Sequence, residues 1–226
     1  GIALMSVAML LVPMMDVTAK YLTETQPPLQ IALARFAFQM VFALLTAAIG
    51  PGLSVLRARR LWPHLLRGFF LSGATVCFFT AVATMPVADA IAIFFVEPMI
   101  LTVLSALVLK EQVGPRRWIA VLVGLAGAAI IIRPGFETFG LTALLPLCAA
   151  LLFALYLVIT RKLSGEGGML CVQFTAGLGG VMLLGVLFVA ANIAGYEPAE
   201  AVMPDLPGWG LLALVGALSF FAHGLI

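Results

Sequence analysis

The chain has 226 residues, of which 63% are hydrophobic and only 10% are charged. A soluble domain carries about 45–50% apolar and about 25% charged residues, so this composition excludes a soluble globule. It also excludes a disordered chain, which requires low hydrophobicity. The net charge of +2 gives no reason to expect nucleic-acid binding. The mean hydropathy of +1.18 instead predicts an all-α, polytopic membrane protein whose main partner is the lipid bilayer.

The membrane-spanning helices can be read from the length of the apolar stretches. A helix needs about 20 mostly apolar residues to cross a hydrocarbon core of about 30 Å. The sequence contains eight such stretches joined by short connections, which leave no room for a soluble domain. The expected helices, in chain order, are residues 2–22, 28–49, 65–85, 88–109, 118–132, 140–159, 169–193 and 209–226.

The connections between these helices differ in the sign of their charge. Nine of the twelve basic residues fall after the second, fourth and sixth helices. The connections after the odd-numbered helices hold mainly acidic residues, with Arg133 as their one base. The positive-inside rule therefore places the even-numbered connections in the cytoplasm. We expect a multi-pass protein of the inner (plasma) membrane with a cytoplasmic N-terminus.

The chain also carries a weak internal repeat. Residues 3–22 are similar to residues 143–163, since both form a long apolar stretch that ends in basic residues and Leu, and Pro134-Gly135 falls between them as a joint. The first unit, residues 1–135, has five expected helices, and this odd number inverts the second unit, residues 136–226, in the membrane. The second unit has only its first three helices. We therefore expect about eight helices of a ten-helix protein, with the second repeat truncated.

Several motifs resemble the EamA family of the drug/metabolite transporter superfamily. The motifs are Ala81–Ala90, Glu97-Pro98, Leu109-Lys110-Glu111, Arg116-Arg117-Trp118, Gly124–Gly127, Arg133-Pro134-Gly135 and, in the second half, Leu151–Tyr156. The sequence departs from the family at Lys110, where Gly is usual. The resemblance implies a ten-helix carrier of two inverted repeats that moves a small metabolite, such as an amino acid, a vitamin or a drug, by alternating access. Many members are exporters or exchangers.

Charged residues inside apolar stretches are candidate functional residues, because each costs a few kcal/mol there. At a rise of 1.5 Å per residue, Asp16, Arg35 and Glu97 lie about 9, 11 and 14 Å from the outer helix ends. One guanidinium and two carboxylates at similar depth suit a zwitterion or an anion. Arg35 could bind a substrate carboxylate, and Asp16 or Glu97 could exchange protons. The alternative is an Asp16–Arg35 ion pair that only orders two helices, with Lys20 capping it.

Glu97 and two further residues are candidates for substrate contact. Glu97 precedes Pro98, which removes a backbone donor and breaks the helix, so this glutamate could face a cavity or could bond the freed carbonyl. Tyr156 could line the pathway or be an interfacial tyrosine. His223 could relay protons or be a neutral histidine bonded to a neighbouring helix.

Other function classes receive less support. The sequence has no phosphate-binding loop and no constellation of metal ligands or nucleophiles, so we expect no enzyme, no metal and no cofactor. A channel or a non-transporting fragment is the alternative function. Small residues at four-residue spacing, Ala120, Gly124 and Ala128, let helices approach closely, and they could form an internal contact or the face of a homodimer.

Overall fold

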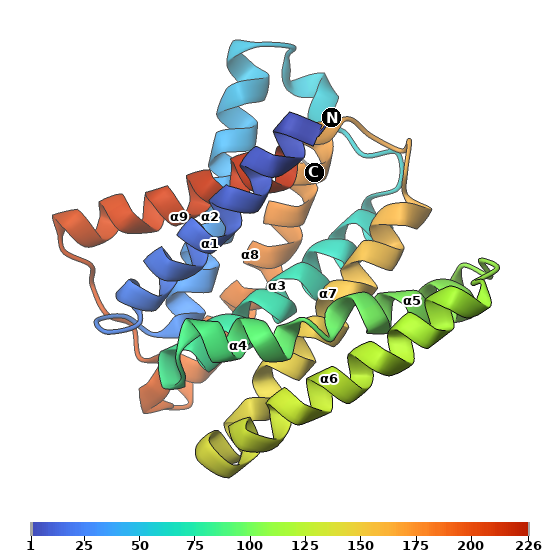
Figure 1. The fold of residues 1–226 in the computed structure, drawn as a ribbon. Coiled ribbons are helices and arrows are strands. Elements are labelled where there is room, and N and C mark those ends of the chain that lie inside the picture. The colour runs from blue at the N-terminus through green and yellow to red at the C-terminus, as the bar shows by residue number, and fades with distance from the viewer. Residues whose placement is uncertain (1, 226) are drawn as a thin grey trace.

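The computed structural model describes residues 2–225, apart from the side chains of residues 2–9, 128–129, 131–137, 198 and 225. The described chain is all helical, without a strand (Figure 1). The α-helices are α1 (Ile2–Leu22), α2 (Pro28–Ile49), α3 (Leu61–Thr84), α4 (Val87–Phe94), α5 (Glu97–Val108), α6 (Pro115–Phe139), α7 (Leu144–Lys162), α8 (Met169–Ile193) and α9 (Leu206–Leu225). Three short 3-10 helices, η1 (Leu53–Leu56), η2 (Gly140–Ala143) and η3 (Glu197–Ala199), lie in the connections.

The predicted class is confirmed, because six segments of the described chain are long and apolar enough to cross a membrane. The count of eight spans stays a prediction. Some predicted bounds were wrong. Helix α3 begins at Leu61 and α9 at Leu206, each several residues early, because Pro63 and Pro207 lie in the first turn, where a helix tolerates proline. Helix α6 continues through Pro134 and Gly135, and the chain turns only at Gly140, whose φ of +58° favours glycine.

Helix α8 lies at the centre of the bundle. It packs along α2 on one side and α3 on the other, while α3 also packs along α7, and α9 packs against α1 and α2 (Figure 1). Helix α8 can be central because glycines let its neighbours approach closely. A Cβ atom at Gly179 would lie 2.7 Å from the carbonyl oxygen of Leu65 and 3.2 Å from Cα of Gly68. The backbones of α3 and α8 are therefore in direct contact.

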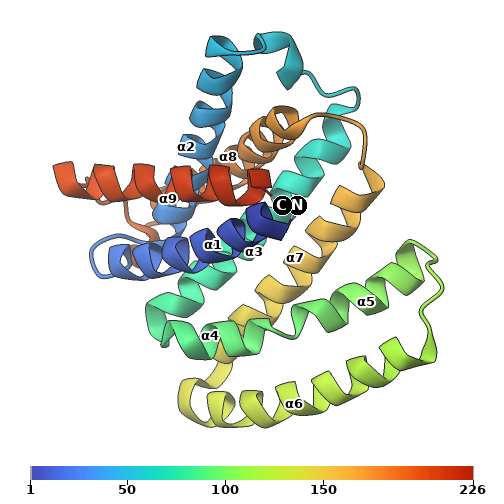
Figure 2. The ribbon, with the colours of Figure 1, turned by 45° about the horizontal axis from the view of Figure 1, so that its top comes forward.

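Helices α4, α5 and α6 form the edge of the molecule (Figure 2). Helices α4 and α5 pack mainly on α7, and α6 leaves large apolar side chains such as Ile119, Leu122 and Val123 exposed, as expected for a surface that meets lipid. A Cβ atom at Gly124 would meet the side chain of Met99 on α5. The central residue of the small-residue stripe is therefore used inside the chain, which favours an internal contact over a homodimer face.

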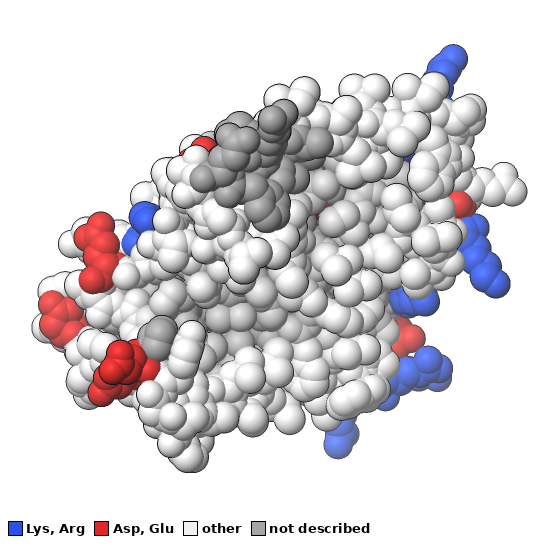
Figure 3. All heavy atoms as spheres, turned by 90° about the horizontal axis from the view of Figure 1, so that it is seen from below, with Lys and Arg blue, Asp and Glu red and all other residues white. Residues whose placement is uncertain are grey.

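Charged side chains gather at opposite ends of the bundle. In Figure 3 most acidic side chains lie at one end and most basic side chains at the other. In Figure 1 the connection between α8 and α9, which contains Glu197, Glu200 and Asp205, lies at the opposite end of the bundle from the connection between α2 and α3, which contains Arg57, Arg59 and Arg60. This separation is the pattern on which the predicted orientation depends.

Lys110, where the EamA motif usually has Gly, adopts a backbone conformation that favours glycine. Lys110, directly after α5, has a φ of +54°, a left-handed conformation that costs a residue with a Cβ atom roughly 1–2 kcal/mol and costs glycine little. We expect Lys110→Gly to raise the free energy of unfolding by about 1 kcal/mol, measured by thermal unfolding in detergent. Lys110→Ala, which removes the charge but keeps the Cβ atom, is the control. Equal stability of the two variants would contradict this explanation.

Candidate substrate site

Arg35 lies at the centre of the bundle, on the face of α2 that meets α3, α8 and α9. Its side chain is 1% exposed. Its Nε donates a hydrogen bond to Oγ of Ser219 on α9 at 3.0 Å, and its Nη1 donates to Oγ1 of Thr75 on α3. One edge of this buried guanidinium is therefore held by two helices, and its Nη2 has no hydrogen-bond partner among the described residues.

The hydroxyl of Ser219 extends this contact into a chain of hydrogen bonds. Ser219 donates to Oε1 of Gln39 at 2.8 Å, and Nε2 of Gln39 donates to Oε1 of Gln173 on α8 at 3.2 Å. Nε2 of Gln173 then donates to the carbonyl oxygen of Phe220 at 2.5 Å. We call Arg35, Gln39, Thr75, Gln173 and Ser219 the Arg35 network. Because hydrogen bonds in a low-dielectric interior polarise one another, such a network orients its members firmly.

Sequence reasoning missed four members of this network, Gln39, Thr75, Gln173 and Ser219. They are neutral, so a search for intramembrane charge does not find them. A usable signal was available for Gln39, which follows Arg35 by four residues and therefore shares its helix face. Sequence reasoning also missed Arg67, which was counted with the basic connection although it is a residue of α3 and 1% exposed.

The predicted Asp16–Arg35 ion pair does not form within the described residues. Asp16 is 7% exposed on α1, and its charge acts on Arg35 without direct contact. Lys20 does not cap the pair either, because its Nζ donates to the carbonyl oxygen of Val82 on α3 at 2.5 Å. The direct contact that this alternative requires is therefore absent among the described residues, although the two charges still act on each other. Asp16 stays a candidate beside the Arg35 network.

Tyr156 and His223 both lie next to the Arg35 network. Tyr156 on α7 is 8% exposed, stacks near Phe153 at a centroid distance of 5.4 Å, and is influenced by the charges of both Arg35 and Arg67. Nδ1 of His223 lies 3.1 Å from the carbonyl oxygen of Ser219. Since a carbonyl only accepts, Nδ1 carries the proton. Among the described residues, the histidine is thus bonded to its own helix and to no neighbouring one.

Glu97 lies apart from this cluster, at a true break in the helix. Helix α4 ends at Phe94 and α5 begins at Glu97. The cause is Pro98, whose ring would clash with the carbonyl of the residue four positions earlier, which is Phe94. Oε1 of Glu97 is buried and has no hydrogen-bond partner within the described residues. The predicted break is confirmed, and the bond from Glu97 to a freed carbonyl is absent there.

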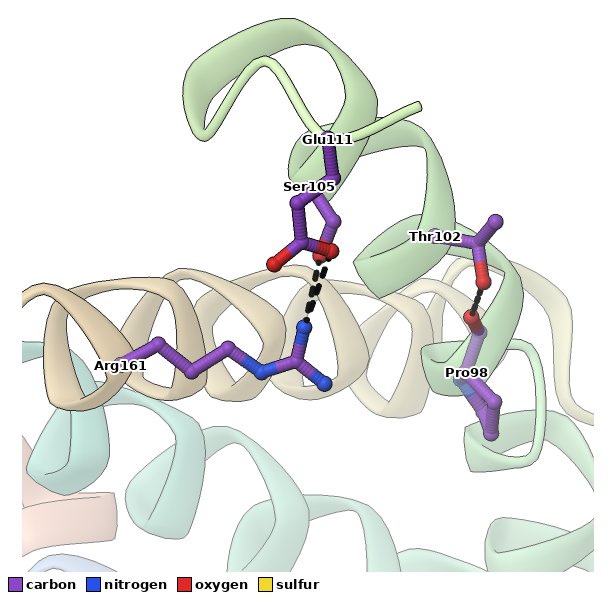
Figure 4. Close-up of polar contacts among 5 residues, drawn as sticks. All are labelled: Pro98, Thr102, Ser105, Glu111 and Arg161. Atoms are coloured by element: carbon purple, nitrogen blue, oxygen red, sulfur yellow. Dashed lines mark hydrogen bonds and ion pairs between the residues drawn. The ribbon is translucent and has the colours of Figure 1, made fainter. Parts of the chain in front are cut away.

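The segment after the break is fastened to α7 (Figure 4). Nη1 of Arg161 donates to Oγ of Ser105 at 3.3 Å and lies 3.4 Å from Oε2 of Glu111. Oγ1 of Thr102 donates to the carbonyl oxygen of Pro98 at 2.8 Å, which supports the first turn of α5. The Arg161–Glu111 pair is close to half exposed, so it contributes little stability. These polar contacts therefore add little to the contact between α5 and α7, which also has an apolar part where Met99 and Ile100 pack with Ala150.

One groove of the described surface lies elsewhere. It has a volume of about 520 Å³, runs between α2, α8 and α9, and has no charged lining residue. The amide of Gln30 at its edge exchanges two hydrogen bonds with the backbone of Val202, at 2.6 and 3.0 Å. The groove therefore offers apolar surface, whereas the groups that could recognise a polar solute lie in the Arg35 network.

Comparison with known proteins adds the family. The family model described as the EamA-like transporter family matches residues 1–133. A riboflavin transporter of Rhizobium johnstonii is 31% identical over 154 residues, covering 67% of this chain and 51% of that protein. An S-adenosylmethionine uptake transporter of Rickettsia prowazekii is 28% identical over 159 residues, covering 70% of this chain and 54% of that protein. The chain thus matches about half the length of these curated relatives.

One solved structure has a similar fold. It is described only as a crystal structure of a protein and superposes with a TM-score of 0.63 at 21% sequence identity, covering 97% of this chain and 79% of that chain. This similarity concerns the fold alone. It shows that the arrangement of nearly the whole chain occurs in a protein whose structure has been solved.

Proposed function

The chain belongs to the EamA-like transporter family, and from this premise we propose that it is a secondary active transporter of a small metabolite. It works in the plasma membrane by alternating access, with its N-terminus in the cytoplasm. The observation that carries the proposal is Arg35, a fully buried guanidinium at the meeting point of four helices, whose Nη2 has no hydrogen-bond partner among the described residues. Such a group in a membrane is expensive and is retained where it has a function.

The packing supports two inverted repeats that meet at this site, residues 1–135 and 136–226. If α1, α2 and α3 correspond to α7, α8 and α9, then the contact of α1 with α9 corresponds to that of α7 with α3. The contact of α3 with α8 likewise corresponds to that of α9 with α2. In this arrangement the α2–α8 contact lies on the pseudo-twofold axis, next to the Arg35 network. Sites of inverted-repeat transporters lie at such repeat interfaces, near the middle of the bilayer.

The substrate class follows from the site and the relatives together. The site offers Arg35 for an anionic group, amides and hydroxyls for neutral polar groups, and Tyr156 for stacking on a ring. Riboflavin and S-adenosylmethionine, named for two relatives, both carry a ring system and polar groups. We propose a metabolite of that kind, an amino acid, a vitamin or a drug-like molecule, moved by exchange or export.

Counterflow in proteoliposomes tests the carrier function. The full-length protein is reconstituted, the vesicles are loaded with unlabelled riboflavin, S-adenosylmethionine, amino acids or nucleosides, and uptake of the labelled compound is followed. A carrier accumulates label transiently when the same compound is inside, because the loaded site returns faster than the empty one. Uptake without trans-stimulation would indicate a channel, and no uptake for any compound of the panel would count against the proposal.

Glu97 is proposed as the proton-coupling residue, because its carboxylate is part-buried beside the break between α4 and α5 and has no partner within the described residues. We expect Glu97→Gln to abolish proton-coupled transport while the protein still inserts and folds. Glu24→Gln, the same change in an exposed connection, is the control. The measurement is uptake with and without an imposed pH gradient. Wild-type uptake and pH dependence in Glu97→Gln would contradict the assignment.

A further inference from the structure

A second group of polar residues lies at the basic end of the bundle, away from the Arg35 network. His64 and Arg67 follow one another at a spacing of three residues on α3, so they share a helix face. His64 is 0% exposed and Arg67 is 1% exposed. Glu166 lies in the connection between α7 and α8, and Arg67 bonds the carbonyl oxygen of Val172, six residues further along the chain at the start of α8. The three residues therefore come from two parts of the chain that lie near one another at this end of the bundle.

These residues hold buried polar atoms without partners. Both ring nitrogens of His64, Nε of Arg67 and Oε2 of Glu166 are buried and make no hydrogen bond within the described residues. A buried polar group without a partner costs about 1–3 kcal/mol, so four such atoms in one place call for an explanation. The groups do not satisfy one another, since no ion pair joins them in the described chain.

Arg67 is nevertheless held in a fixed position. Its Nη2 donates to the carbonyl oxygen of Val172 at 3.1 Å and to Oγ1 of Thr175 at 3.2 Å, both on α8. The next residue, Gly68, lies at the backbone contact between α3 and α8. These two hydrogen bonds hold the guanidinium group of Arg67 in place, so its Nε stays without an acceptor in the described chain.

The unmatched atoms are complementary to one kind of ligand. Arg67 and a protonated ring nitrogen of His64 are donors and suit a carboxylate, whereas the Glu166 carboxylate is an acceptor and suits an ammonium group. We infer that His64, Arg67 and Glu166 form a second binding site for the zwitterionic, amino-acid-type end of a small metabolite. Its carboxylate lies toward Arg67 and His64, and its ammonium group toward Glu166.

The position of this second site fits a route through the protein. Arg67 lies on α3, eight residues before Thr75 of the Arg35 network, which is about 12 Å along the helix. The connection that carries Glu166 includes Gly165, Gly167 and Gly168, with Gly165 at a φ of +89°, so it can rearrange at little cost when a ligand enters. This inference rests on the proposed transport of a small metabolite, and it adds a second binding site at the basic end of the transport route.

The test measures binding and not transport, so it can fail independently of counterflow. The chain has only two histidines, His64 and His223, and the ring nitrogens can be labelled with ¹⁵N and observed by NMR in nanodiscs. A His223→Asn variant assigns the signals. The probes are glycine, which carries only the two charged groups, and its halves, acetate and methylammonium. We expect glycine to shift the His64 signal saturably, with a Kd at least fivefold below that of either half.

Two variants make the result decisive. Glu166→Gln, in a connection where it cannot break a helix, should raise the Kd for glycine about tenfold, to that of acetate. Arg67→Gln should abolish the shift with both compounds. A saturable shift with acetate equal to that with glycine would identify a plain anion site and overturn the inference. No shift with glycine, or the same shift in Glu166→Gln, would overturn it as well.

Discussion

Replacing Arg35 by Gln should abolish transport while leaving a folded protein in the membrane. Gln can still bond one of the two hydroxyls that Arg35 contacts, Ser219 and Thr75, but it offers no charge and no free guanidinium edge to the substrate. Hydrogen bonds to charged groups contribute about 1.5–3 kcal/mol. The substrate Kd should therefore rise about tenfold to a hundredfold, and uptake at low substrate concentration should fall to background.

The matched control for this prediction is Arg116→Gln, the same change at an exposed residue in the first turn of α6. Its uptake should stay within about twofold of the wild type, because an exposed charge is well solvated and screened. Thermal unfolding in detergent shows whether Arg35→Gln remains folded. A folded Arg35→Gln protein that binds and transports the wild-type substrate normally would remove Arg35 from the site.

Filling the contact between α3 and α8 should have the largest effect on assembly. A Cβ atom at Gly179 would lie 2.7 Å from the backbone oxygen of Leu65, and neither backbone can yield without moving a helix. Overpacking of a well-packed contact costs about 1–3 kcal/mol, so Gly179→Ala should lower the unfolding free energy by about that amount. Gly179→Leu should prevent α8 from docking between α2 and α3 and so remove folded protein from the membrane.

Gly185, two turns further along α8, is the control. A Cβ atom there meets nothing within 4 Å, and Ala is favoured over Gly within a helix by about 0.5–1 kcal/mol. Gly185→Ala should therefore stabilise slightly where Gly179→Ala destabilises. Unfolding in mixed micelles measures both. The account of the central contact fails if the two variants change stability in the same direction.

The class of the protein could be read from its composition, because the hydrophobic pattern of a membrane protein is set by the thickness of the bilayer. The break at Pro98 could also be predicted from the sequence, because it depends only on the local geometry of the proline ring. The end of α6 could not be predicted from the sequence. Pro134 and Gly135 are typical of a joint, yet the helix runs on to Phe139, and neighbouring contacts can outweigh local preference.

The candidate site was only partly predictable. Arg35 and Asp16 were found because a charge in an apolar stretch is visible in sequence. The partners of Arg35 could not be predicted. They are the hydroxyl groups of Ser219 and Thr75, and serine and threonine hydroxyls are common in helices and carry no charge. Arg67 was missed because it lies only two residues after the predicted helix start at residue 65, where a basic residue usually flanks the span, whereas α3 begins at Leu61.

The central claim is that the Arg35 network is a substrate site that opens to each side of the membrane in turn. It can be tested at Thr75, which donates its own hydroxyl to Leu71 and accepts from Arg35. In a protein whose native Cys77, Cys148 and Cys171 are replaced by Ala, Thr75→Cys is treated with a membrane-impermeant thiol reagent from either side. The account predicts modification from both sides and protection by transported substrate. A cysteine at this position that reacts from neither side, or that substrate does not protect, would contradict it.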